Sequence, residues 1–168
     1  MTRSGIEQLL YMMDQAFEGD PSGRGQWHAL LVNLASLRDE DWTWLPPDGK
    51  RTVLSLVEDI GICKYVYASQ AFEDRSVHWD KPASVPGLKV DSSHEEVISW
   101  LRAAQEHWRS CVEALADDTE LLRMRLSPQG NERETRWIIK TMIEHDIYHS
   151  GEINHIRALA QKNDEGNE

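Results

Sequence analysis

The sequence predicts an all-α protein, a four-helix bundle with long loops between its helices. Three observations predict this fold. Four long segments carry apolar residues at three- and four-residue spacing, their connectors differ greatly in length, and the two-residue alternation typical of strands is missing. With 168 residues, 40% of them hydrophobic, the chain can build one core and is too short for two domains. We therefore expect a single bundle over residues 1–161 and a polar, frayed tail at 162–168.

The first helical segment is split by a turn-rich stretch. Helical periodicity covers Ser4–Phe17 and returns over residues 26–37, in the letters QWHALLVNLASL. We predict either one interrupted helix or two collinear pieces. The connector at 38–50 contains PPDG, in which the prolines cannot continue a helix and the Asp-Gly pair is typical of a turn.

The second helix is predicted to begin near Thr52, a plausible N-cap. Its inward residues are expected to be Val53, Leu56, Val57, Ile60, Cys63 and Val66. A long loop at about 73–91 follows, with two prolines and a glycine.

The third and fourth helices complete the bundle. Ser93, followed three residues later by Glu96, is a capping-box pattern at the start of the third helix. Its apolar stripe is Val97, Leu101, Ala104, Trp108, Cys111 and Leu115. After a loop that contains Pro128 and Gly130, the last helix is expected at about 133–161.

Charge and cysteine content exclude several classes of protein. The net charge of −11 and a pI near 5.0 disfavour nucleic-acid binding, because an acidic surface repels phosphate. Cys63 and Cys111 form no CxxC pair and fit a reduced, cytoplasmic protein. We expect no secretory signal and no membrane span. No Ser-His-Asp order or glycine-rich phosphate loop is present in the sequence.

The last helix carries two histidines on its apolar stripe. At about 100° per residue, His149 and Glu152 lie within roughly 60° of His145. Three apolar residues define this face as the buried one: Ile138, Met142 and Ile156. A buried imidazole must find hydrogen-bond partners or bind a metal, and two of them four residues apart can converge on one ion. The alternative is that each is a core histidine bonded to a neighbour.

A third ligand would come from another helix, and Asp59 is the candidate. It shares a stripe with Ile60 and Cys63, on which no Lys or Arg lies, so a buried Asp59 would need a cation. The alternative is a rolled helix in which Asp59 and Glu58 both reach solvent. Cys63 is either a thiolate ligand or, as we favour for a lone cysteine on an apolar stripe, a small hydrophobe.

Two stretches resemble a known family. HDIYHSGEI at 145–153 is similar to the last-helix signature of the DinB-like (YfiT-like) metal-binding four-helix bundles, and WHALLVNLASLRDEDWTWLPPDGKRTVLSLVEDIG at 27–61 resembles their first helix, connector and start of the second helix. This resemblance implies a divalent ion, of Zn, Ni, Mn or Fe, held by one residue of the second helix and two of the last. His145 and His149 fall on two of these positions. Asp59 falls on the third, where the family has His, so the carboxylate binds directly, acts through water, or marks a lapsed site.

The resemblance also implies a function. Characterised relatives include bacterial thiol S-transferases and mycothiol-dependent isomerases, so we expect a metal-dependent transferase, or a hydrolase, that activates a small thiol or water against an electrophile. Glu152 stands where the family has Gln and is our catalytic candidate, as proton acceptor, ligand or partner of a ligand. A homodimer is plausible by the same resemblance. The alternative is a non-catalytic binding or stress-response protein whose metal site is structural or lapsed.

The other histidines and a tyrosine are assigned smaller roles. His28 either lines the pocket or is a capping or buried residue, and Tyr148 either donates a proton to a substrate or packs. His155 points about 80° away from the metal stripe and is expected on the surface. The remaining histidines show no constellation: His78, His94 and His107.

Overall fold

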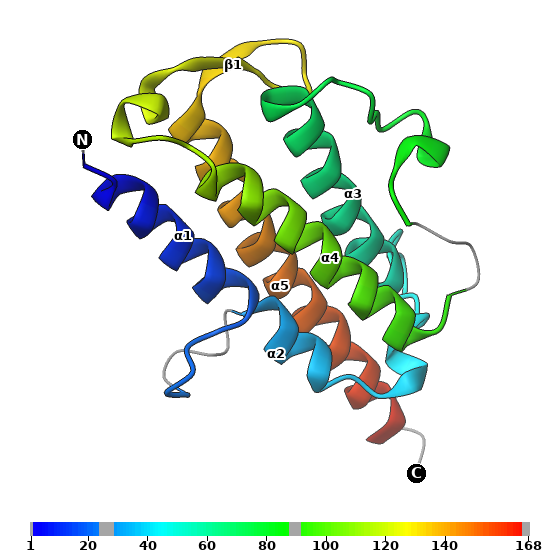
Figure 1. Cartoon of the computed structure of the whole chain (residues 1–168). Coiled ribbons are helices and arrows are strands. Elements are labelled where there is room, and N and C mark those ends of the chain that lie inside the picture. The colour runs from blue at the N-terminus through cyan, green and yellow to red at the C-terminus, as the bar shows by residue number, and fades with distance from the viewer. Residues whose placement is uncertain (1, 24–28, 88–91, 166–168) are drawn as a thin grey trace.

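The computed structural model describes residues 2–23, 29–87 and 92–165. Five α-helices account for most of these residues: α1 (Ser4–Phe17), α2 (Leu30–Ala35), α3 (Val53–Phe72), α4 (His94–Glu113) and α5 (Thr135–Glu165). Short 3-10 helices lie in the connections, at Asp39–Trp42, Pro82–Ser84 and Asp118–Leu122. Helix α3 packs against α4 and α5, and α1 packs against the same two helices, which closes a four-helix bundle (Figure 1). The predicted fold class is confirmed.

The helices of the bundle differ in direction and in the length of the connections between them. Helix α2 follows α1 along the same side of α5 in Figure 1, as the two collinear pieces predicted for the first segment. Helices α3 and α4 run in the same direction, so the long connection between them must return along the length of the bundle.

Helix starts follow the predicted capping chemistry. The Thr52 hydroxyl accepts a hydrogen bond from the Ser55 backbone N–H at 3.2 Å. At α4, the Glu96 N–H donates to the Ser93 hydroxyl at 3.3 Å, and the Ser93 N–H donates to the Glu96 carboxylate at 2.8 Å. These bonds satisfy backbone donors that a helix leaves free at its N-terminus. In the connector before α3, the Gly49 N–H donates to the Pro46 carbonyl at 2.8 Å, which closes the predicted turn.

A small β-hairpin corrects the expectation that no strands form. Strand β1 (Met124–Leu126) pairs antiparallel with β2 (Glu132–Glu134), with Arg125 opposite Arg133. The predicted loop is its turn, where Gly130 has φ 82°. Strands of three residues are too short to display an alternating pattern, which is why periodicity missed them.

The last helix is longer than predicted. Helix α5 begins at Thr135 and continues to Glu165, so part of the predicted frayed tail is helical, and residues 166–168 lie outside the described ranges. No helix within those ranges is long and apolar enough to span a bilayer.

A small hydrophobic cluster packs Val66 and Ala104 against the loop that follows α3. Two larger clusters fill the rest of the bundle. One, near the hairpin, contains Cys63, Trp108 and Ile143, and the other, near α2, contains Ile60 and Ile153. The residues predicted to face inward from α3 are all buried. On α4 the prediction was wrong only for Cys111, which is half-buried because the stripe drifts around the helix. Along α3 the two larger clusters change over between Ile60 and Cys63, directly after Asp59, and along α5 they are separated by the stretch from Ile143 to Ile153, which contains His145 and His149.

Candidate metal centre

Helices α3 and α5 bring the predicted ligands to one place. His149 is the deepest, with a side chain 4% exposed, and His145 one turn earlier is 23% exposed. Asp59 approaches from α3 with 35% of its side chain exposed, between the buried and the solvent-facing alternatives. The group is therefore closed at His149 and reaches solvent on the side of Asp59 and His145.

Three ligand atoms form a compact triangle. The two imidazole Nε2 atoms are 3.2 Å apart, and the Asp59 Oδ2 atom is 3.6 Å from Nε2 of His149 and 3.9 Å from Nε2 of His145. The point equidistant from the corners of such a triangle lies about 2.1 Å from each of them, which matches the Zn–N and Zn–O bond lengths of protein sites. Two imidazoles and a carboxylate also form a donor set that first-row divalent metals accept. The residues present therefore fit such an ion.

Glu152 orients one of the two rings. Its Oε2 atom is 2.9 Å from Nδ1 of His149. A carboxylate only accepts, so Nδ1 carries the hydrogen and donates it, and the tautomer with no hydrogen on Nε2 presents a lone pair there. A carboxylate behind a histidine in this way is the usual support for a metal-binding imidazole. The catalytic role predicted for Glu152 stays a prediction.

His145 is held neutral by its surroundings. Burial, followed by the neighbouring His149, lowers the pKa of His145 to about 4, although Asp59 opposes this effect. Its Nδ1 atom is buried and has no hydrogen-bond partner among the described residues. Without an ion, Nε2 of His145 can donate a hydrogen bond to Nε2 of His149, but the lone pair at Nδ1 of His145 then has no hydrogen-bond donor. This ring is therefore less fully satisfied than that of His149.

Arg51 supplies a cation that the sequence analysis did not find. Its guanidinium donates to Oδ2 of Asp59 at 2.8 Å and lies 3.8 Å from Glu152. Arg51 precedes the helix and folds back onto it, so a search along the Asp59 stripe could not detect the contact. With neutral imidazoles, the two carboxylates and Arg51 leave the group with one net negative charge, which favours a further cation.

Cys63 lies one turn from Asp59 and behaves as a thiol. Its Sγ atom is 4.0 Å from Oδ1 of Asp59, and the side chain is buried. Burial, with a smaller contribution from Asp59, raises the pKa of Cys63 to about 12. The group nevertheless lies close enough to Asp59 and His145 for one ion to touch all three. The small-hydrophobe interpretation agrees with this burial, and the role of Cys63 as a ligand stays a prediction.

A buried ion pair beside the centre was missed by the sequence analysis. Nζ of Lys64 on α3 lies 2.7 Å from both oxygens of Asp146 on α5, and the two side chains are 0% and 1% exposed. Burial raises the pKa of Asp146, and Lys64 opposes this. A signal was available, because Lys64 falls four residues after buried Ile60 and Asp146 four residues after buried Met142.

The remaining predictions have mixed outcomes. His155 is exposed, as predicted. Tyr148 is 69% exposed with its ring centre 5.0 Å from that of His149, so it does not pack in the core, and its role as a proton donor stays a prediction. His28 lies outside the described residues. His107 does belong to a constellation, with Glu73 at 2.9 Å, because a residue of another helix completes it.

Comparison with known proteins agrees with this architecture. A search of curated proteins found no match. The family model of the DinB superfamily matches residues 24–153, a stretch that contains Asp59, both histidines of the centre and Glu152. The match covers more than half of the sequence, and the bundle has the arrangement that the family predicts. The chain belongs to the DinB superfamily.

Proposed function

We propose that the protein is a divalent-metal-dependent enzyme that activates a low-molecular-weight thiol, or water, for attack on an electrophile. The observation that carries the proposal is the triangle of Asp59, His145 and His149, with sides of 3.2 to 3.9 Å. These three residues would hold the ion. When bound, the ion would lower the pKa of a coordinated thiol or water. The donor set is compatible with Zn²⁺, Ni²⁺, Mn²⁺ and Fe²⁺.

The chain's own residues divide the remaining work. His149 sits at the buried base and is oriented through Nδ1 by Glu152. Asp59, His145 and Glu152 are each partly exposed, so a substrate would approach from their side. We propose that the Glu152 carboxylate, 30% exposed, takes the proton that the thiol or water loses. Arg51, 42% exposed on the same side, would attract an anionic substrate group.

A second candidate function rests on the contact between Arg51 and Asp59. The guanidinium of Arg51 lies 2.8 Å from the Asp59 carboxylate and already balances its charge. Asp59, which stands where the family has His, would then serve as the partner of Arg51 and not as a metal ligand. The protein would then be a binding or stress-response module with a structural or lapsed metal site. The expected homodimer and the cytoplasmic location stay predictions under either function.

Metal content separates the two functions. We would measure ions per chain in protein purified without added metal and again after soaking in Zn²⁺, Ni²⁺ and Mn²⁺, for the wild type and for His149→Ala. The matched control is His155→Ala, which removes an exposed histidine from the same helix. The proposal expects His149→Ala to lose about one ion per chain relative to both other proteins. A difference below about a tenth of an ion would favour the lapsed site.

Turnover then tests the enzymatic step. The loaded wild type should consume a small thiol together with an electrophile, across a panel of both, and His149→Ala should not. A fully loaded protein that consumes neither thiol nor electrophile, and hydrolyses no ester or amide in the same panel, would leave only the structural role of the ion.

A further inference from the structure

A second group of potential metal ligands lies at the other end of α3. Glu73 is the C-cap residue that follows α3, and His107 and Cys111 lie one turn apart on α4. Nε2 of His107 is 2.9 Å from Oε1 of Glu73, Sγ of Cys111 is 3.8 Å from the same oxygen, and the three ligand atoms all lie within 4.8 Å of one another. At 1.5 Å per residue along α3, the group is about 20 Å from Asp59, so the two groups share no ligand.

The order of contacts argues against a nucleophilic cysteine. In a Cys–His–acid arrangement, the imidazole lies between the thiol and the carboxylate. Here the carboxylate of Glu73 lies between Cys111 and His107 and accepts from both. Burial, followed by the charge of Glu73, raises the pKa of Cys111 to about 11, so the free thiol stays protonated. The geometry brings a sulfur, a nitrogen and an oxygen donor to one point, which is a ligand set for a borderline-soft cation.

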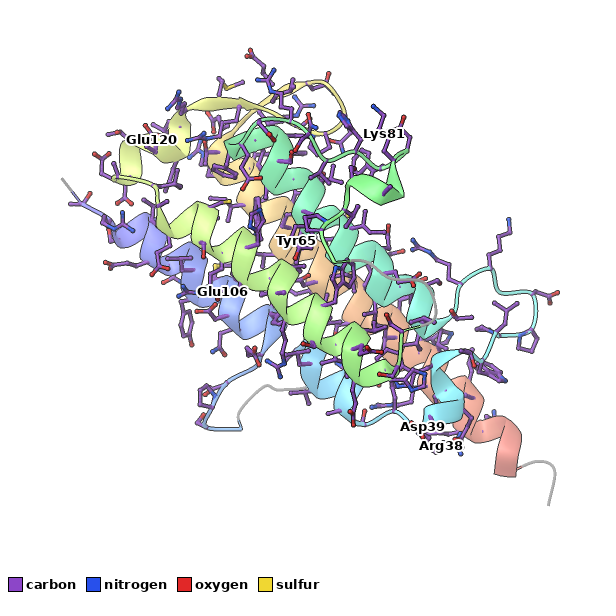
Figure 2. The ribbon with its side chains drawn as sticks, turned by 45° about the vertical axis from the view of Figure 1, so that its right-hand side comes forward. Arg38, Asp39, Tyr65, Lys81, Glu106 and Glu120 are labelled. Carbon is purple, nitrogen blue, oxygen red and sulfur yellow. The ribbon has the colours of Figure 1, made fainter. Side chains whose placement is uncertain are left out.

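The surroundings leave this group open on one side. The three residues line a hollow of about 560 Å³, shared with Phe72 and Arg125. Arg125 is directed to Glu120, at 2.8 Å, and so does not neutralise Glu73. Figure 2 labels Glu120, beyond the end of α4, and Tyr65, which lies between α3 and α4.

The ring of His107 is supported and accessible. Its centre lies 5.3 Å from that of Tyr65, in a tilted contact that restricts its rotation. The side chains of His107 and Glu73 are 38% and 36% exposed, so an ion from solvent can reach them.

We propose that Glu73, His107 and Cys111 bind one Zn²⁺ ion at a site independent of the Asp59 centre, with its fourth position open to the hollow. Binding forms a Zn–S bond and releases the Cys111 thiol proton to solvent, and the neutral His107 ring carries its proton on Nδ1. The distance between His107 Nε2 and Glu73 Oε1 must open from 2.9 Å to about 3.3 Å, the separation of two ligands in a tetrahedral site with bonds near 2.0 Å. A side-chain rotation at the two partly exposed residues suffices for this change.

Cobalt spectroscopy reports on the thiolate ligand directly. Titration of the full chain with Co²⁺, which substitutes for Zn²⁺, should produce a sulfur-to-cobalt charge-transfer band in the near ultraviolet. Zn²⁺ should displace it. Cys111→Ser should abolish the band, and Glu73→Gln should weaken zinc binding by more than about 100-fold, beyond the loss typical of a group that only supports a ligand. His149→Ala should keep the band unchanged.

Cys63→Ala is the matched control, because Cys63 is the other cysteine and lies beside Asp59. The proposal expects the band to persist in this variant. Absence of a band in the wild type, or a band that is lost in Cys63→Ala and kept in Cys111→Ser, overturns the proposal.

Thermal unfolding gives a readout that does not depend on spectra. Zinc should raise the Tm of His149→Ala and should not raise that of the double variant His149→Ala/Cys111→Ser. Equal zinc shifts in the two variants would overturn the proposal. If this proposal fails, the activity proposed at Asp59 is unaffected, because the two groups share no ligand. That activity is tested separately, with His149→Ala.

Discussion

Two buried polar residues of α5, Asp146 and His149, lie one turn apart and differ in whether their partners reach solvent. Asp146 is enclosed with its counter-ion, because Lys64 contacts both of its oxygens at 2.7 Å and neither side chain reaches solvent. His149 is equally buried, but its partners Asp59, His145 and Glu152 are each partly exposed and carry excess negative charge even with Arg51 counted. The same two helices thus hold a closed ion pair and an open donor set.

The difference separates a structural ion pair from a candidate site for a metal ion. In a buried ion pair the two charges balance each other, so no further ion is needed. Removal of one partner destabilises the fold, because the other charge is then buried without a counter-ion. An open set with converging lone pairs and a net negative charge is stabilised by adding a cation. Variants at the closed pair should therefore change stability, whereas variants at the open set should change metal affinity.

The largest expected effect is on stability, at Lys64. Lys64→Met leaves the Asp146 carboxylate buried without a counter-ion, and we expect the free energy of unfolding to fall by about 3–5 kcal/mol. Urea denaturation at neutral pH measures this. The double variant Lys64→Met/Asp146→Leu removes both charges and should recover most of the loss.

The control for this prediction is an exposed ion pair on α5, the helix that carries Asp146. Lys140 contacts Glu144 at 2.7 Å with more than half of each side chain exposed. Lys140→Met should cost less than about 1 kcal/mol. Equal costs at Lys64 and Lys140 would show that burial does not distinguish the pairs.

Periodicity predicted the helices and the faces on which the candidate ligands lie, and it missed contacts that come from outside a helix or from the packing of two helices. The spacing of His145 and His149 and the stripe of Asp59 are properties of single helices, so the sequence contains them. Arg51 precedes α3, and Glu73 meets His107 only through the packing of α3 on α4. Such contacts depend on helix rotation and on loop paths, which local spacing does not determine. The hairpin was missed because three-residue strands contain too little pattern.

The next effect is on metal affinity, at Glu152. Glu152→Ala removes the acceptor of the His149 Nδ1 hydrogen bond, and we expect metal affinity to fall about 10–100-fold. Competition with a chromophoric chelator measures this. Glu152→Gln can still accept the bond through its amide oxygen and should lose less. A greater loss in Glu152→Gln than in Glu152→Ala would contradict an orienting role.

A separate effect on stability is expected from pH, through His145. Burial lowers the pKa of His145 to about 4 in the folded protein, from the ordinary histidine pKa of 6.5 that applies in the unfolded chain. Between these values the unfolded chain binds a proton that the folded chain does not, so the contribution of His145 is present above pH 6.5 and is lost as pH falls toward 4. The slope is at most about 1.4 kcal/mol per pH unit for one proton. Urea denaturation of metal-free protein should show a flatter pH dependence for His145→Asn, and an identical slope would contradict the assignment.

The smallest expected effect has the opposite sign, and it shows whether Arg51 competes with a metal ion for Asp59 or orients Asp59 toward it. Arg51→Met keeps most of the side-chain length and removes the cation that competes for Oδ2 of Asp59. Because partly exposed ion pairs contribute up to about 1 kcal/mol, metal affinity should rise by no more than about fivefold. Arg102→Met, which breaks an exposed pair with Glu18, is the control and should leave affinity unchanged. If metal affinity instead falls in Arg51→Met, the guanidinium orients Asp59 toward the ion. Arg51 would then support the Asp59 ligand at the start of α3, as Glu152 supports the His149 ligand on α5.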